Sequence, residues 1–90
     1  MRAIITVAGK DRVGISASVT HTLAERNVNV LDITQTILPP DFFTMVMLVD
    51  CAKVELPFAE LVALVEGAGR DRGLFIHIQR EDIFNAMHRI

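Results

Sequence analysis

The sequence predicts an α+β fold with the element order β-α-β-β-α-β, followed by a short C-terminal helix. Segments rich in β-branched residues alternate with two segments whose apolar residues recur at helical spacing. With 90 residues, of which 51% are hydrophobic and 6% aromatic, the chain has enough apolar material for one compact aliphatic core. We therefore expect a single globular unit.

The first half of the chain predicts a strand, a helix and a second strand. Residues 2–8 (RAIITVA) predict a strand that ends at Gly9. Residues 14–26 follow a helical period, and Asn27 is expected to end that helix; its inward face would carry Ile15, Val19, Thr22 and Leu23. Residues 28–38 predict a half-buried strand, because Leu31, Ile33 and Ile37 alternate with Asp32, Thr34 and Thr36.

The second half repeats this order. Pro39, Pro40 and Asp41 predict a hairpin into a strand at residues 42–50, where Met45 and Met47 are expected in a core or an interface. Pro57 predicts the start of a second helix, and Gly67 and Gly69 are expected to end it. Residues 74–79 predict a fourth strand. The last segment predicts an amphipathic helix with an apolar stripe of Ile83, Phe84, Met87 and Ile90.

Two βαβ units in this order predict a ferredoxin-like sandwich, a four-stranded antiparallel sheet with two helices on one face. We assign residues 1–80 to this domain and residues 81–90 to an amphipathic C-terminal helical tail. The other face of the sheet also carries apolar residues, which the tail, a second subunit or both would cover.

The composition argues against some classes of partner and indicates a cellular compartment. The net charge of −2 and the scattered basic residues argue against nucleic acid as a partner. The longest apolar runs are too short for a membrane span, and the N-terminus lacks the pattern of a signal peptide. The lone Cys51 predicts a buried thiol in a reducing compartment. We expect a cytoplasmic protein without a membrane partner.

A charged turn follows the first predicted strand. Gly9 and Gly14 flank the segment that contains Lys10, Asp11 and Arg12, at the start of the first helix. Together with the βαββαβ order, the turn Asp11-Arg12-Val13-Gly14 and the helix-to-strand junction RNVNV at residues 26–30 resemble those of ACT domains. The resemblance covers residues 2–79, and among ACT domains the chain looks most like the stand-alone proteins related to the glycine-cleavage regulators. Val13 stands where many members have proline.

The resemblance implies a non-catalytic regulatory module that binds a small molecule, often an amino acid, at a homodimer interface. One wall of the implied site consists of Asp11, Arg12, Val13, Gly14 and Ile15. The other consists of Asn29, Val30 and Leu31, often supplied by the adjacent subunit. A partner enzyme or regulator would receive the signal.

The chemistry of these residues fits an amino acid. Backbone N–H groups at a helix N-terminus suit a carboxylate, and Gly14 has no Cβ to obstruct a ligand. Arg12 offers a charged donor, while Asp11 and Asn29 offer acceptors for an ammonium group. The same segment also fits a solvated turn without a ligand, in which Asp11 only caps the helix.

Other functions have less support in the sequence. An acylphosphatase-like enzyme would use Arg12 for phosphate, but no asparagine is placed to orient water, so we assign no catalytic residue. The three histidines lie on separate predicted elements, and we expect neither a metal nor a cofactor. RNA binding would need a basic surface around Phe42 and Phe43. A protein-interaction module without a ligand remains an alternative.

Overall fold

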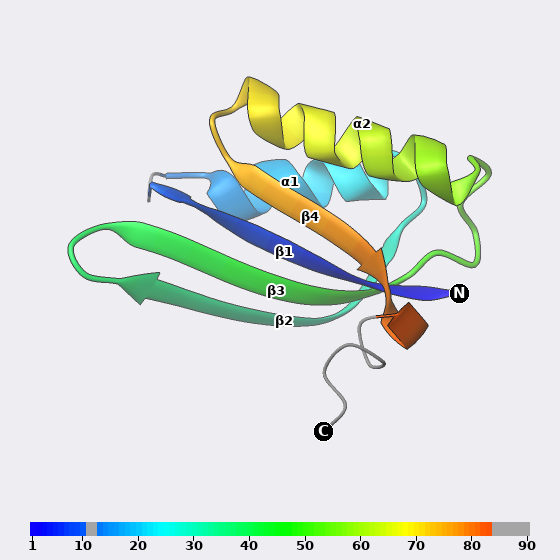
Figure 1. Cartoon of the computed structure of the whole chain (residues 1–90), viewed down its shortest axis with the longest axis horizontal. Coiled ribbons are helices and arrows are strands. Elements are labelled where there is room, and N and C mark those ends of the chain that lie inside the picture. Colours follow the sequence, from blue (N-terminus) through cyan, green and yellow to red (C-terminus); the bar gives the residue numbers. More distant parts are fainter. Residues whose placement is uncertain (11–12, 84–90) are drawn as a thin grey trace.

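The structure is a computed structural model that describes residues 1–10 and 13–83. Its four-stranded sheet has the spatial order β2-β3-β1-β4, with antiparallel neighbours throughout. The strands are β1 (Arg2–Lys10), β2 (Asn29–Leu38), β3 (Phe42–Asp50) and β4 (Phe75–Arg80). Helices α1 (Ile15–Ala24) and α2 (Phe58–Asp71) both lie on one face of this sheet (Figure 1). This arrangement confirms the predicted ferredoxin-like α+β fold.

The core lies between this face of the sheet and the two helices. Alternate residues of the central strands are buried, so that Ala3, Ile5 and Val7 of β1 face the helices. The same face of β3 carries Met45 and Met47, both fully buried, which confirms them as core residues. Each helix adds residues at a spacing of four, which are Ile15, Val19 and Leu23 in α1 and Leu61, Val65 and Gly69 in α2.

Three glycines do not end the elements that they were predicted to end. Strand β1 continues to Lys10, because Gly9 pairs with Phe43 in the sheet. Helix α2 continues through Gly67 and Gly69 to Asp71. A Cβ atom at Gly69 would lie 2.6 Å from Cγ1 of Ile76 and 2.7 Å from its Cδ1. Gly69 therefore allows close packing of α2 on β4, and the glycine serves tertiary contact instead of a helix end.

Helix α1 ends as the sequence predicts. Asn27 adopts a left-handed conformation with φ of 63° directly after the last turn. Asparagine is one of the few residues that adopt this conformation readily at a helix C-terminus. The chain then enters β2 at Asn29.

The prediction that β2 is half-buried is wrong for the single chain. Pairing with β3 places Ile33 and Ile37 on the helix side of the sheet, yet they are 42% and 53% exposed. Strand β2 is the edge farthest from α2, and the helices lie toward the opposite edge (Figure 1). Leu31 lies at a register shift between Val30 and Asp32 and is also exposed. The apolar side of this strand thus has no cover from the described residues.

After β4, residues 81–83 make a helical turn, as the predicted tail requires at its start. Phe84, Met87 and Ile90 of the predicted apolar stripe lie outside the described residues. Within the described ranges, neither helix is long and apolar enough to cross a membrane.

Candidate functional site

The start of α1 is an open helix N-terminus. Gly14 occupies the N-cap position with φ of 88°, a left-handed conformation that favours glycine. No side chain of the described residues caps the helix, and its first turn contains no acidic residue. The first N–H to bond within the helix is that of Ser18, which donates to the Gly14 carbonyl at 2.9 Å. The amides of Ile15, Ser16 and Ala17 precede that bond, so they have no acceptor within the helix itself.

A cavity of about 380 Å³ adjoins this helix end. Gly14 and Ile15 line it together with Ser18 of α1, and the end of α2 and the start of β4 contribute Asp71, Arg72 and Leu74. A Cβ atom placed on Gly14 would meet nothing within 4 Å, so the space in front of its backbone is open. The lining thus includes the start of α1, one acidic residue and one basic residue.

Three residues of the predicted first wall, Val13, Gly14 and Ile15, line this cavity. Val13 is fully exposed, and Ile15 is only 4% exposed, so the Ile15 side chain belongs to the core while its backbone faces the helix end. Asp11 and Arg12 lie outside the described residues. Asp71 and Arg72 were not predicted from the sequence, because they become neighbours of Gly14 only when α2 packs beside α1. Ser18 was also not predicted as a lining residue, although the helical period places it one turn after Gly14.

Gly9 has a steric role near this cavity. A Cβ atom at Gly9 would lie 2.8 Å from Cδ2 of Leu74, which lines the cavity and is itself buried. The missing side chain makes room for Leu74 at the start of β4. Leu74 thereby forms an apolar floor beside the charged groups of Asp71 and Arg72.

The predicted second wall lies at the opposite end of the sheet in the same chain. Asn29 pairs with Asp50, which pairs with Arg2 at the start of β1, whereas the charged turn follows Lys10 at its end. Arg2 and Lys10 are eight residues apart along β1, a separation of about 27 Å at ~3.4 Å per residue. Val13–Ile15 and Asn29–Leu31 therefore do not meet within one chain.

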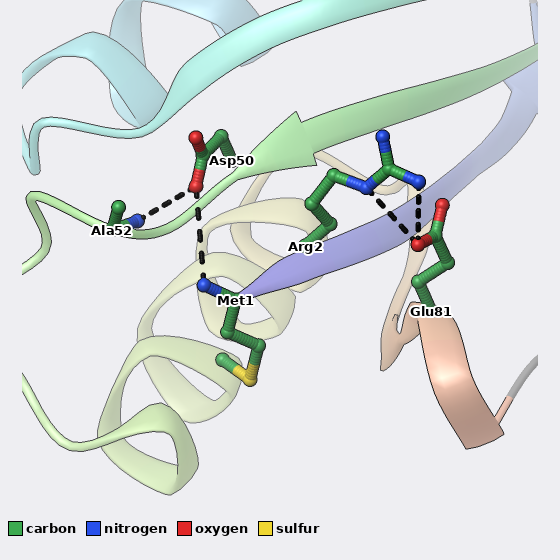
Figure 2. Close-up of polar contacts among 5 residues, drawn as sticks. All are labelled: Met1, Arg2, Asp50, Ala52 and Glu81. Carbon is green, nitrogen blue, oxygen red and sulfur yellow. Dashed lines mark hydrogen bonds and ion pairs between the residues drawn. The ribbon is translucent and has the colours of Figure 1, made fainter.

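A second depression of about 440 Å³ lies beside Asn29. It is lined by the end of α1, the turn into β2, the end of β3 and the residues that follow β3, among them Asn27, Asp50 and Lys53. The Asp50 carboxylate accepts a hydrogen bond from the Ala52 amide at 2.9 Å and lies 4.0 Å from the N-terminal ammonium group (Figure 2). Asp50 thus has local partners of its own.

The polar side chains within residues 1–10 and 13–83 include neither a metal-binding cluster nor an exposed thiol. Among the described residues, no group of three His, Cys, Asp or Glu side chains lies close enough to hold a metal ion. Cys51 is 8% exposed, and burial raises the pKa of its thiol. A protonated, buried thiol is a poor nucleophile.

The ferredoxin-like fold serves many unrelated functions, so the fold alone does not identify the class of protein. Comparison with known proteins makes the assignment specific, because the family model of the ACT domain matches residues 2–79. The chain belongs to the ACT domain family. The predicted resemblance is therefore confirmed.

Relatives and solved structures agree with this assignment. A UPF0237 protein of Listeria monocytogenes is 50% identical over 90 residues, which cover 100% of both chains. An ACT domain protein from Streptococcus pneumoniae has a TM-score of 0.82 and 41% identity, covering 97% of each chain. The regulatory subunit of aspartate kinase from Thermus thermophilus has a TM-score of 0.65 and 28% identity, covering 87% of this chain and 50% of that one. A putative glycine cleavage system transcriptional repressor shares the fold, with a TM-score of 0.71 and 21% identity. The match covers 87% of this chain and 44% of that one.

Proposed function

We propose that this protein is a cytoplasmic, non-catalytic regulatory module that binds a small molecule, an amino acid, at a homodimer interface. It would pass its ligand state to a partner enzyme or regulator. The observation that carries the proposal is the open N-terminus of α1 at Gly14, next to a cavity with charges of both signs. The family assignment supports a regulatory role, and a 28% identical neighbour is the regulatory subunit of an amino-acid kinase.

The cavity has groups for both ends of a zwitterion. The amides of Ile15 and Ser16, together with the positive end of the α1 dipole, favour a carboxylate. Arg72 lines the same cavity and would add a charged donor, with a guanidinium that also donates to the Ala68 carbonyl at 3.3 Å, and the Asp71 carboxylate suits an ammonium group. A ligand that carries both charges therefore fits this site better than a simple anion does.

The edges of the sheet differ, and this difference favours dimerisation through β2. At the β4 edge, Glu66 of α2 accepts a hydrogen bond from the Ile78 amide at 3.2 Å and lies 3.5 Å from Nδ1 of His77. Helix α2 thus occupies part of that edge. The β2 edge carries the exposed Ile33 and Ile37, and an exposed apolar edge strand favours pairing with another strand.

Antiparallel pairing of two β2 strands about a two-fold axis would also bring together the two predicted walls. In a centred register, Asn29 of one chain lies opposite Leu38 of the other, at the sheet end where β1 finishes. The distance from β1 to the second chain's β2 is then three strand spacings, about 14 Å, instead of the ~27 Å within one chain. In such a dimer, Asn29, Val30 and Leu31 of the second chain would complete the site.

A thermal-shift screen against the amino acids tests ligand binding. A ligand at ~100 times its Kd should add about 2.7 kcal/mol, and each kcal/mol should raise the Tm of a domain this size by roughly 4–8 °C. The methyl ester of the same amino acid, which lacks the carboxylate, should give a much smaller shift. If no amino acid shifts the Tm at millimolar concentration, ligand sensing by this site is wrong.

Light scattering tests the dimer separately. The wild type should have twice the mass of one chain. Ile33→Lys should have the mass of a single chain, because a charge on the β2 edge opposes pairing. Phe75→Lys on the β4 edge is the matched control, since Phe75 is 63% exposed and should leave the dimer intact. A monomeric Phe75→Lys beside a dimeric Ile33→Lys would place the interface at the other edge.

A further inference from the structure

The outer face of the sheet, opposite the helices, is uncovered by the described residues. Register places Ile4 of β1 beside Leu48 of β3, and Thr6 beside Val46, on this face. Val46 is 43% exposed, and Ile4 and Leu48 are partly exposed. We call Ile4, Val46 and Leu48 the outer patch. Three aliphatic side chains in contact positions on the central strands favour an apolar cover.

The chain leaves β4 toward the outer patch. Arg2 lies on the outer face, because its neighbour Ala3 is fully buried on the helix side. Its guanidinium donates to Oε1 of Glu81 from Nε at 3.0 Å and from Nη2 at 2.8 Å (Figure 2). This double contact holds the first residue after β4 beside the start of β1, on the same side as Ile4. Residues 81–83 already form a helical turn there.

The sequence after this turn has the apolar pattern and the length that a cover for the outer patch needs. In a helix, Ile83, Phe84, Met87 and Ile90 share one side, and Asn85 and Arg89 lie on the opposite side. Ten residues from 81 to 90 span about 15 Å as a helix. The distance across the sheet from β4 to β2 is three strand spacings, about 14 Å. The segment is therefore long enough to cross β1 and β3 and to end over β2.

We propose that residues 83–90 dock as an amphipathic helix across the outer patch of their own chain, with Glu81 held by Arg2 as the fixed point. The occupant of this face is the chain's own C-terminal segment, because the ion pair starts it on that face and its length and apolar stripe fit the width. This docking also separates the outer face from the β2 edge, which stays available for a second copy. It does not depend on the ligand proposed above.

A single tryptophan tests the docking directly, because the chain has no Trp or Tyr. In the full chain, Phe84→Trp should give blue-shifted fluorescence, since its ring would lie on the patch. Asn85→Trp, on the opposite side of the same helix, is the matched control and should emit like a solvent-exposed indole. Adding Leu48→Lys to Phe84→Trp should return its emission to that of the control, while circular dichroism shows that the fold is retained.

Four results would overturn the proposal. Equal, exposed emission from Phe84→Trp and Asn85→Trp would mean that the segment does not dock. A blue shift that disappears on dilution, together with the dimer, would place the segment on the partner chain. A blue shift that survives Leu48→Lys would place it away from the outer patch. In the wild type, nuclear Overhauser contacts between the Phe84 ring and the Leu48 methyl groups should be present, and their absence would equally contradict the docking.

Discussion

Two glycines in α2 offer a matched pair of substitutions that tests how this helix packs. Gly67 and Gly69 both lie in the last turns of α2, so alanine should improve helix propensity by about 0.5–1 kcal/mol at either position. Their surroundings differ. A Cβ atom at Gly67 would meet only the Arg70 guanidinium at 3.6 Å, an ordinary contact, whereas one at Gly69 would lie within 2.6 Å of the buried Ile76.

The two effects have opposite signs at Gly69. Overpacking of a core contact costs roughly 1–3 kcal/mol, which exceeds the gain in propensity. We therefore expect Gly69→Ala to lower the free energy of unfolding by about 1–2 kcal/mol and Gly67→Ala to raise it by about 0.5–1 kcal/mol. Urea denaturation of both variants, at one protein concentration because the stability of a dimer depends on it, measures the difference.

A double variant distinguishes the contact with Ile76 from a general effect on the helix. Ile76→Ala removes both the Cγ1 and the Cδ1 atoms, which would lie 2.6 Å and 2.7 Å from the new methyl group of Gly69→Ala. It should cost about 2–5 kcal/mol alone and less in the Gly69→Ala background, because the shared contact makes the two changes non-additive. If Gly69→Ala stabilises the protein as much as Gly67→Ala does, the packing argument is refuted.

The remaining predictions concern Gly14, Cys51 and Glu66. Gly14→Ala should cost about 1–2 kcal/mol in urea denaturation, because φ of 88° strains any residue with a Cβ, and a neutral result would contradict the left-handed cap. Because burial raises the pKa of the Cys51 thiol, the folded state keeps a proton that the unfolded chain releases above the ordinary thiol pKa. The free energy of unfolding should therefore be constant below that pKa and fall as pH rises through it. Cys51→Ala should not show this fall. Alkylation of Cys51 should also be slow until the protein unfolds, and fast alkylation of the folded protein would refute its burial. Glu66→Ala should cost roughly 0.5–1.5 kcal/mol by removing the acceptor of the Ile78 amide, and amide exchange at Ile78 should accelerate; an unchanged rate would mean that Glu66 does not protect this edge.

The sequence predicted the order of elements because strand and helix periods are local properties. It could not predict the role of Gly69, because the close approach of Ile76 arises only when α2 packs on β4. The exposure of Ile33 and Ile37 was missed for a similar reason. Alternation shows that a strand has an apolar side, but the lateral position of the helices decides whether that side is covered in one chain.

The candidate site shows the same division between local and non-local information. Gly14 was identified from its place after a strand and before a helix, and the structure places it at the open start of α1. Asp71 and Arg72, which lie nearly sixty residues further along the chain, have no sequence signal that links them to Gly14. The separation of Val13–Ile15 from Asn29–Leu31 along the sheet also became visible only in the strand register.

The central claim is that an amino acid binds at the start of α1 in a site that a second chain completes. The most direct measurement is an amide NMR titration of the wild type and of Ile33→Lys with an amino acid that raises the Tm. In the wild type, the resonances of Ile15 and Ser16 should shift together with those of Asn29 and Leu31, and in monomeric Ile33→Lys the shifts at Asn29 and Leu31 should be lost. If the ligand shifts none of these amides, or shifts Asn29 and Leu31 equally in the monomer, the proposed site is contradicted.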